Sequence, residues 1–560
     1  MEETLRKAIH DALVAEGAGD TVFALEWPAD LAHGDFATNA ALASAKALGR
    51  APRDVAEALA PRIRESLGEL VETVSVAGPG FVNLTLAKPA VTGALAEALR
   101  KPEVWGAGTL RAGERVAFEY SCPNPFKEMH VGHLMSTVIG EATSRLIENQ
   151  GARVLRDTYG GDVGPHVAKA LWALRRKGIA EPETAEEIGD AYAQGSRAYE
   201  ESEEAKAAID ALNATLYQTL AKEAADRTEE ERMLYELWRH GRDISLAAHK
   251  AVWDALDTSF DYVLHESETT PVGLSEVLAG LERGVFRMSE GAVIYDGEAK
   301  GLHTLVFVTS RGTPTYEAKD VGLAFLKEAR LGPLDHSYIT TAAEQSGHFA
   351  VFLAALEELA PELARKTMHV PHGFLRLTEG KMSSREGNVI TAVTLIEDLV
   401  AKAQEKNDDP LIARAVAIAA IKYMILRQSA GSDIIFDPEK SLSLDGDSGP
   451  YLQYALVRAK SVLAQPGSPE SLSVSPRSLD DLERLLIRFP EVARRAEALR
   501  APHAVAQYLT QLAGEWNSFY AANRIMGNPD EAHLRAVARA FAITMERGLS
   551  LLAIPVPERM

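Results

Sequence analysis

The sequence predicts a three-part chain: a small α+β unit, a central α/β domain with a parallel sheet, and an all-helical end. Three patterns support this prediction. β-Branched runs alternate with amphipathic helices in the first part, a strand–loop–helix–strand unit spans 115–158, and helical periodicity continues from 395 onward. A chain of 560 residues is long enough for about three or four domains. We place the domains at 1–105, 106–395 and 396–560.

The first unit combines short helices with short strands. Gly78, Pro79 and Gly80 form a turn signal directly before its last strand. The expected helices cover 4–16, 39–48 and 53–66, and the expected strands cover 72–76 and 81–86. This mixture predicts a small α+β domain.

The central domain begins with a βαβ unit. A buried strand at 115–120 leads through a loop into a helix over 132–149, and the next strand covers 152–158. Two strands joined in this way lie parallel in a Rossmann-like sheet, and such sheets bind nucleotides where the strands end. A helical insertion is expected at about 180–285. Further strands are predicted at 292–295, 302–308 and 337–341.

The composition excludes several classes of protein. The single cysteine, Cys122, excludes an intrachain disulfide and a multi-cysteine structural zinc site, and a reducing cytoplasm suits it. No run approaches the ~18 apolar residues of a membrane span, and the amino terminus does not resemble a secretory signal. We therefore expect a cytoplasmic protein with no membrane partner.

The net charge of −21 is unevenly distributed. Residues 181–240 contain 16 acidic and 6 basic residues, whereas residues 401–560 contain 19 of each. Because salt screens each charge beyond about 8 Å, an acidic chain can still bind RNA through one local basic face. Solvated helix surface is the default interpretation of the acidic stretch.

The first chemical motif is HVGH, residues 130–133, between a predicted strand and a predicted helix. His130 and His133 can donate to phosphate oxygens, Gly132 allows an adenine ring to approach the backbone, and the helix start carries partial positive charge. By itself the motif is weak, because surface or core histidines produce the same pattern more often.

The second motif is KMSSREG, residues 381–387, which begins directly after Gly380. Lys381 and the hydroxyls of Ser383 and Ser384 suit a transient hold on a pyrophosphate leaving group. By itself the segment fits a solvated loop equally well.

Together, in this order, the two motifs resemble the paired signatures of class I aminoacyl-tRNA synthetases. Residues 119–151, EYSCPNPFKEMHVGHLMSTVIGEATSRLIENQG, resemble the arginine-specific family, whose pattern is matched by Pro123, Asn124 and Lys127. The resemblance extends through HGDFATNAAL, GPGFVNLTL, GDSGPYLQYALVRAKSVL and the closing LLAIPVPERM, and it is weakest at 165–300 and 465–500. It implies an appended first domain that contacts the tRNA elbow, a Rossmann-like catalytic domain, and an all-α anticodon-binding domain.

This resemblance also implies a reaction and its participants. ATP would activate L-arginine to arginyl-adenylate, and the arginyl group would pass to the 3′-terminal adenosine of its tRNA. Mg²⁺ would be carried by ATP, the protein itself would hold no metal, and the chain would be a monomer. The implied catalytic residues are His130, His133, Lys127 and Lys381; the ATP site adds Gly132, Met382, Ser383 and Ser384; the arginine site comprises Glu119, Asn124, Tyr316, Asp320 and Gln345.

The proposed arginine pocket also has a physical basis. A guanidinium group presents five donors in a rigid fork, which a carboxylate can answer bidentately. Glu119 ends an apolar strand, where an unpaired carboxylate would cost several kcal/mol, so we expect the cationic substrate to be its partner. One exposed helical turn is the alternative explanation for Tyr316 and Asp320.

Some features leave alternatives open. The family often has Gly-Asp-Trp-Gly where this chain has GGDVGPH, so the role of Asp162 stays open. Cys122 is interpreted as a small packing residue, because the chemistry uses no thiol nucleophile. The aromatic residues near the end are expected in a helix core, with one or two of them stacking on anticodon bases. They are Tyr508, Trp516, Phe519 and Tyr520.

Two other functions fit the sequence less well. A paralogue that transfers an activated amino acid to another acceptor would have little use for tRNA-binding appendages. A catalytically silent tRNA-binding protein would not need intact HVGH and KMSS motifs. The sequence does not reveal the tRNA identity elements, the oligomeric state, or whether tRNA is required for arginine activation.

Overall fold

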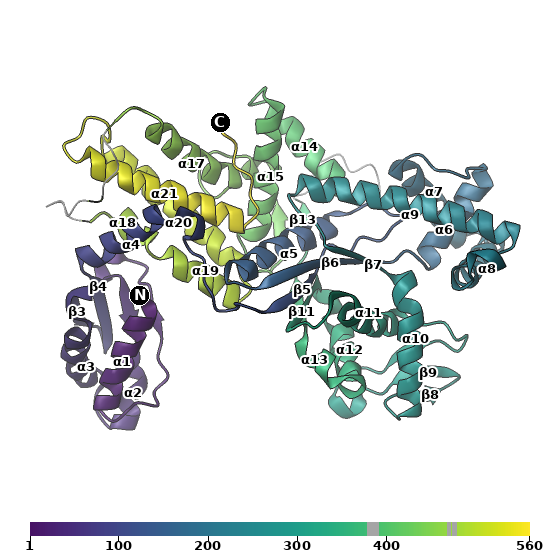
Figure 1. Cartoon of the computed structure of the whole chain (residues 1–560), viewed down its shortest axis with the longest axis horizontal. Helices are drawn as coiled ribbons and strands as arrows, with labels where there is room; N and C mark the ends of the chain where they lie inside the picture. Colours follow the sequence, from purple (N-terminus) through teal and green to yellow (C-terminus); the bar gives the residue numbers. More distant parts are fainter. Residues whose placement is uncertain (378–390, 468–471, 473–478) are drawn as a thin grey trace. The chain divides into compact units, whose positions relative to one another are not determined.

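A computed structural model gives the structure of residues 1–377, 391–467, 472 and 479–560. These residues form two units (Figure 1). The first comprises 1–107, 451–495 and 507–548, and the second comprises 108–450, 496–506 and 549–560. The KMSSREG motif lies outside the described residues.

The first unit contains the predicted α+β fold at its amino-terminal end. Its four strands form an antiparallel sheet in the order β1-β2-β4-β3. The strands are β1 (Leu25–Glu26), β2 (Phe36–Thr38), β3 (Val71–Ala77) and β4 (Phe81–Leu86), and the helices are α1 (Glu2–Ala15), α2 (Ala40–Leu48), α3 (Pro52–Leu67) and α4 (Lys88–Arg100). Strands β1 and β2 are too short to have a recognisable sequence period, and they were not predicted.

The same unit contains helices from the end of the chain. Residues 451–495 and 507–548 of this unit include most of five helices: α17 (Gly449–Leu463), α18 (Asp481–Leu486), α19 (Phe489–Ala498), α20 (Pro502–Ala522) and α21 (Glu531–Leu551). Trp516 is fully buried and stacks on Phe541 with 4.6 Å between ring centroids, while Tyr508 is buried and donates to the Leu485 carbonyl. Phe519 is also buried, whereas Tyr520 is half-buried against Arg458. Three of the four aromatic residues therefore lie in the predicted helix core.

The second unit is built on a five-stranded parallel sheet in the order β12-β11-β5-β6-β7. The strands are β5 (Arg115–Glu119), β6 (Arg153–Gly160), β7 (Tyr262–His265), β11 (His336–Ala342) and β12 (Thr367–His372). The order confirms the predicted parallel, Rossmann-like sheet. Strands β6 and β7 lie on one side of β5, and the later strands β11 and β12 lie on the other side. The point between β5 and β11 is therefore the switch point of the strand order, and ligands bind outside the carboxyl ends of the strands at such a point.

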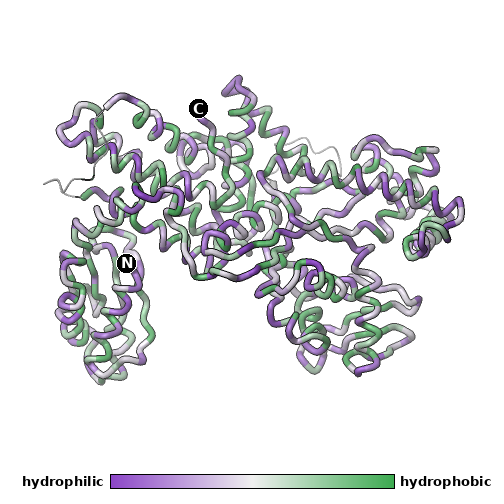
Figure 2. The backbone as a smooth tube through the Cα atoms, viewed as in Figure 1, coloured by the Kyte–Doolittle hydropathy of each residue, from purple (hydrophilic) through white to green (hydrophobic). Residues whose placement is uncertain are grey.

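Helices cover this sheet and extend from it as a bundle (Figure 1). Helix α5 (Val131–Asn149) joins β5 to β6. Helices α6 (Pro165–Lys177), α7 (Ala185–Glu201), α8 (Glu203–Ala221) and α9 (Glu229–Ala255) share one apolar core that includes Leu171, Leu216 and Trp238. Hydrophobic and hydrophilic stretches alternate along these helices in Figure 2, as expected for helices that bury one face.

A second helical layer carries two of the predicted site residues, Tyr316 and Asp320. Helices α10 (Glu266–Glu282), α11 (Tyr316–Leu331), α12 (Ser346–Leu359) and α13 (Pro361–Lys366) lie beside an antiparallel sheet of β8 (Arg287–Ser289), β9 (Ala292–Tyr295) and β10 (Leu305–Val308). Helices α10 and α11 approach each other closely through glycines. A Cβ on Gly273 would lie 1.9 Å from the Ala318 carbonyl oxygen, and one on Gly322 would lie 2.2 Å from the Thr269 carbonyl oxygen.

The remaining elements of the second unit follow the parallel sheet. They are β13 (Leu375–Leu377), α14 (Ala392–Gln404), α15 (Pro410–Leu426), β14 (Ile434–Phe436) and α16 (Pro438–Ser441). Lys422 of α15 is buried and donates to the carbonyls of Leu256 and Ala553. This unit continues past the predicted boundary at 395 to Pro450, and the predicted domain limits stay predictions. Across the described ranges, none of the helices has the length and apolar character needed to cross a bilayer.

We predict that Gly322→Ala lowers the free energy of unfolding by about 1–3 kcal/mol, because its methyl group would collide with the backbone of α10. Urea unfolding followed by circular dichroism measures this loss. Gly347→Ala in α12 is the matched control, since a Cβ there meets no atom within 4 Å. Equal midpoints for the two variants would contradict the close-approach role of Gly322.

Candidate active site

A pocket of about 400 Å³ lies at the switch point between β5 and β11. Residues from the ends of both strands, the loop after β5, and helices α5, α11 and α12 line it. Eight of the predicted site residues are among the lining residues: Glu119, Asn124, His130, Gly132, His133, Tyr316, Asp320 and Gln345. The lining also includes residues that were not predicted, such as Glu317, His348 and His372.

The loop between β5 and α5 is held in an unusual backbone conformation. Ser121, Cys122 and Phe126 have φ values of 72°, 51° and 66°, in the left-handed region that non-glycine residues rarely occupy. A hydroxyl from another element holds each backbone N–H: Ser121 N donates to Ser136, Cys122 N to Thr158, and Phe126 N to Ser245. Such strain persists where surrounding structure fixes it, typically at functional sites.

The two motif histidines cap the start of α5. His130 Nδ1 accepts from Gly132 N at 3.0 Å, and His133 Nδ1 accepts from His130 N at 3.2 Å. Burial lowers the pKa of both rings, and the charge of Lys127 lowers it further. Each ring is therefore neutral, with its proton on Nε2, because Nδ1 is an acceptor. Each histidine thus has one Nε2–H available for a phosphate oxygen.

Of the other predicted catalytic residues, Lys127 is described by the structure and does not line this pocket. Lys127 Nζ lies 4.8 Å from the ring centroid of Tyr192 in α7, and the Lys127 carbonyl contacts His249 Nε2 at 3.1 Å. Lys127 is not among the residues that line the pocket. Lys381, Met382, Ser383 and Ser384 lie outside the described residues.

Asn124 and Asp162 occupy neighbouring positions with different roles. Asn124 Oδ1 accepts from Gly161 N at 2.8 Å, which fixes the amide so that its NH₂ group is the donor left for a ligand. Asp162 is fully buried and accepts from Ser267 N at 2.9 Å and Ser267 Oγ at 2.7 Å at the start of α10. Arg242 lies 3.5 Å from its carboxylate. The sequence left the role of Asp162 undecided, and in the structure this residue anchors the start of α10.

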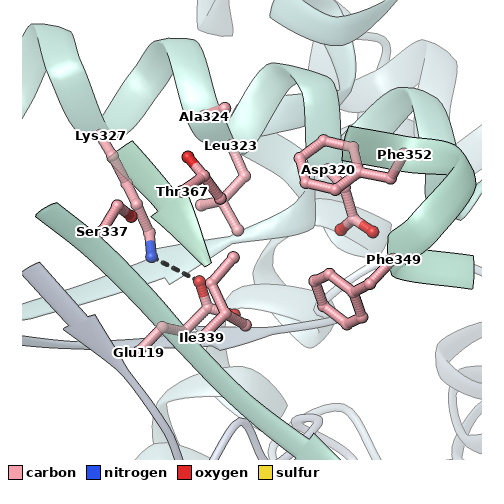
Figure 3. A pocket seen from close by; sticks show the side chains of 10 residues that line it. All are labelled: Glu119, Asp320, Leu323, Ala324, Lys327, Ser337, Ile339, Phe349, Phe352 and Thr367. Carbon is pink, nitrogen blue, oxygen red and sulfur yellow. Dashed lines mark hydrogen bonds and ion pairs between the residues drawn. The ribbon is translucent and has the colours of Figure 1, made fainter. Parts of the chain in front are cut away.

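Glu119 already has a cationic partner in the protein. Lys327 Nζ of α11 lies 2.5 Å from Glu119 Oε2 and 2.5 Å from Asp157 Oδ2. Figure 3 shows this ammonium group beside Glu119, across a small cavity from Asp320. The expectation that Glu119 is unpaired without substrate is therefore wrong. Glu119 and Asp157 are register partners on adjacent parallel strands, so two carboxylates lie side by side and need a cation between them.

The charges of this buried trio depend on one another. Burial raises the pKa of Asp157 to about 7, although Lys327 opposes this shift. Burial opposes the charged form of Lys327, but Asp157 and Glu119 outweigh it and raise the pKa of its ammonium group. Glu119 Oε1 lies 3.6 Å from Cys122 Sγ, on the side of the carboxyl group that Lys327 does not occupy. Lys327 therefore holds one oxygen of Glu119, and the other oxygen accepts a weak hydrogen bond from the Cys122 thiol.

Asp320 also has a partner in the protein. His348 Nε2 lies 2.6 Å from Asp320 Oδ2, and His348 Nδ1 lies 3.5 Å from Glu317 Oε1. Tyr316 begins the same helix and is 64% exposed, so its hydroxyphenyl group is open to a ligand. The arginine-site set is thus gathered in one pocket, but neither carboxylate has both oxygens open for a bidentate contact.

Sequence reasoning missed Lys327 and His348. A signal exists for Lys327, since Asp320 and Lys327 are seven residues apart and so share one face of α11. His348 follows Gln345 by three residues at the start of α12. Cys122 lines the pocket, and burial raises the pKa of its thiol, with Glu119 raising it further, which disfavours a nucleophilic thiolate. Within the described ranges, no cluster of three or more histidine, cysteine, aspartate or glutamate side chains can hold a metal ion.

The chain matches three family models in order along its length. Residues 1–86 match the "Arginyl tRNA synthetase N terminal domain", residues 95–438 match "tRNA synthetases class I (R), catalytic domain", and residues 452–560 match the "DALR anticodon binding domain".

Known proteins resemble the chain over most of its length. The arginine–tRNA ligase of Bacteroides thetaiotaomicron is 30% identical over 525 residues, which are 86% of each chain. That of Porphyromonas gingivalis is 30% identical over 542 residues, covering 89% of this chain and 88% of the relative. The solved arginyl-tRNA synthetase of Thermus thermophilus covers 100% of both chains with 27% identity and a TM-score of 0.79. A Plasmodium falciparum structure, 19% identical with a TM-score of 0.79, shows likeness of fold.

We predict that Lys327→Met lowers the free energy of unfolding by about 3–5 kcal/mol at pH 8, because it leaves two buried carboxylates without a cation. The loss should shrink as the pH falls toward 7. The pKa of Asp157 is about 7 with Lys327 in place, and removing Lys327, which lowers this pKa, raises it further, so the folded variant takes up this proton at a higher pH than the wild type does and then needs no cation. Urea unfolding at pH 6, 7, 8 and 9 measures this dependence.

The matched control is Lys300→Met, which removes a surface lysine whose acid partners Glu357 and Glu358 are largely exposed. It should change stability by about 1 kcal/mol or less. A Lys327→Met loss that is equally small, or that does not depend on pH, would contradict the role of Lys327 as the cation shared by Glu119 and Asp157.

Proposed function

This chain belongs to the class I arginyl-tRNA synthetases, and we propose from this premise which residues carry each part of its reaction. It is an arginine–tRNA ligase that uses ATP, arginine and tRNA as substrates. The observation that supports the residue assignment most strongly is one pocket at the switch point. It gathers the HVGH histidines and the five arginine-site residues.

We propose that the first step needs no protein nucleophile. The arginine carboxylate attacks the α-phosphate of ATP, a P–O bond to the bridging oxygen breaks, and pyrophosphate leaves with arginyl-adenylate formed. His130 and His133 each donate Nε2–H to phosphate oxygens as negative charge develops there. Gly132 leaves room for the His130 ring, because a Cβ there would lie 2.8 Å from its Cε1 atom, and its bare backbone suits a close approach of the nucleotide. ATP arrives as its Mg²⁺ complex, so the metal is part of the substrate.

We propose that Lys127 and Lys381 contribute positive charge to the reaction, Lys127 from outside the pocket lining. Lys127 lies in the loop before His130 and lowers the pKa of both histidines, so its positive charge reaches the phosphate end of the pocket. Lys381, Met382, Ser383 and Ser384 follow the family pattern of a segment that holds the pyrophosphate, and this assignment rests on the sequence motif.

We propose that arginine is recognised by polar groups of several elements. Glu119 Oε1 and an oxygen of Asp320 accept from the cationic groups of arginine. The fixed amide of Asn124, the open phenol of Tyr316 and the side chain of Gln345 complete the set. A site of this kind rejects analogues that lack its donors by about 10⁴–10⁵-fold. Citrulline, whose side chain is neutral, and lysine, which lacks the forked guanidinium group, should both fail to be activated.

In the second step we propose that the terminal ribose hydroxyl of the tRNA attacks the adenylate carbonyl, and AMP leaves. The family relationship supports contacts of the first domain with the tRNA elbow and of the last helices with the anticodon. We further propose that the enzyme acts as a monomer in the cytoplasm, and that tRNA must be bound before arginine is activated.

ATP–pyrophosphate exchange tests the function directly. We predict exchange that requires arginine and increases on addition of the cognate tRNA, while lysine and citrulline give rates near background. The measurement is the incorporation of labelled pyrophosphate into ATP, with a non-cognate tRNA as control. Exchange that proceeds equally with another amino acid, or that is absent with arginine and tRNA, would contradict the proposed reaction.

We predict that Glu119→Gln and Asp320→Asn each weaken arginine use by about 1.5–3 kcal/mol, the worth of one charge-assisted hydrogen bond. The KM for ATP should change less than twofold, because neither residue lies at the histidine end of the pocket. Steady-state exchange kinetics with varied arginine and varied ATP separate these effects. Glu328→Gln is a control on the same helix, because Glu328 pairs with Lys366 and does not line the pocket. Normal arginine kinetics in both variants would remove the pocket assignment.

A further inference from the structure

His348 lies between two carboxylates at the edge of the arginine pocket. Glu317 and Asp320 are three residues apart on α11, so both side chains face the start of α12, where His348 stands. The Nε2 atom is 2.6 Å from Asp320 Oδ2, and the Nδ1 atom is 3.5 Å from Glu317 Oε1. Both ring nitrogens face carboxylate oxygens, and a ring that donates from both nitrogens is an imidazolium.

The surroundings fix this ring in place. The His348 ring meets Phe349 edge-on, with 5.5 Å between centroids, and Phe349 stacks on His369 of β12 at 4.1 Å. His369 does not compete for the carboxylates, because its Nε2 contacts Thr341 Oγ1 and burial lowers its pKa to about 4. Burial opposes the charged form of His348, but its hydrogen bonds to Asp320 and Glu317 outweigh burial and raise its pKa to about 10.

His348 is the group that favours the ionised form of Asp320. Three acids face Asp320: Glu119 of β5, Glu317 of its own helix, and Glu266 of α10, together with the phenol of Tyr159 on β6. Burial raises the pKa of Asp320, Glu119 and Glu317 raise it further, and the hydrogen bond and charge of His348 lower it. Without His348, the groups named here all favour protonated Asp320, which cannot serve as an anionic acceptor.

We propose that His348 is a positioning residue for arginine: it holds Asp320 Oδ2, keeps this carboxylate ionised, and leaves Oδ1 for the guanidinium group. Lys327 holds Glu119 in the same way, through Oε2. The pocket thus offers the substrate single oxygens from two separately anchored carboxylates. This inference rests on the assignment of Asp320 to the arginine site.

The test compares His348→Gln with wild type in tRNA-supported pyrophosphate exchange from pH 5.5 to 8.5. Glutamine can donate an N–H to Asp320 but carries no charge. We expect kcat/KM for arginine to fall about 10-fold at pH 8 and about 100-fold at pH 6, because Asp320 protonates more readily in the variant. The KM for ATP should stay within twofold. His369→Gln, which removes a neutral imidazole from the same cluster, should show no such change with pH.

Asp320→Asn and the double variant separate the possible results. We expect His348→Gln to add little in the Asp320→Asn background, because His348 acts through Asp320. If Asp320→Asn leaves the KM for arginine unchanged, the site assignment itself is wrong. If Asp320→Asn raises this KM while the loss caused by His348→Gln is the same at every pH, the assignment stands and the role of His348 is wrong.

If His348→Gln does not fold, carbon-13 NMR of histidine-labelled wild-type protein tests whether His348 is an imidazolium. One of the 15 histidines should keep the chemical shift of an imidazolium up to pH 9, and Asp320→Asn should move that resonance. Fifteen histidines that all lose their proton below pH 8 would overturn the proposal.

Discussion

The active site depends on one buried ammonium group placed between two carboxylates. Parallel pairing of β5 with β6 puts Glu119 directly beside Asp157, and two such anions in a buried position repel each other. Lys327 reaches both of them from α11. The contact therefore ties α11 to the sheet, and α11 carries Tyr316 and Asp320. A buried ion pair of this kind adds little net stability, but it fixes one arrangement of charges.

The same principle recurs on the other side of the pocket, where His348 stands between Glu317 and Asp320. Each acid that faces the substrate is held through one oxygen by a cation of the protein. Groups held in this way need no reorganisation when a cation arrives, which is how a preorganised polar site gains selectivity. The nucleotide end is preorganised differently: backbone N–H groups hold the two histidines, and the strained loop before them is fixed by hydroxyls, including Ser245 from the helical insertion.

Much of this arrangement could be predicted from the sequence. The βαβ unit was visible because a buried strand and an amphipathic helix have different apolar periods, and HVGH marked where the strand ends. The pairing of Lys327 with Glu119 could not be deduced, because it spans 208 residues between α11 and β5 and follows from the sheet order. Because this long-range partner was not visible in the sequence, Glu119 was wrongly expected to be unpaired. The pairing of His348 with Asp320 could not be deduced either, because it depends on how α12 packs beside α11. Strands β7 and β12 were missed because neither was distinguished from its surroundings by its apolar pattern.

The central claim is that arginine meets two carboxylates already anchored by Lys327 and His348. A crystal structure with bound L-arginine tests it most directly. The account predicts cationic nitrogens of arginine about 3 Å from Glu119 Oε1 and from Asp320 Oδ1, with Lys327 still on Glu119 Oε2 and His348 still on Asp320 Oδ2. A guanidinium group that displaces either resident cation, or that binds away from both carboxylates, would contradict it.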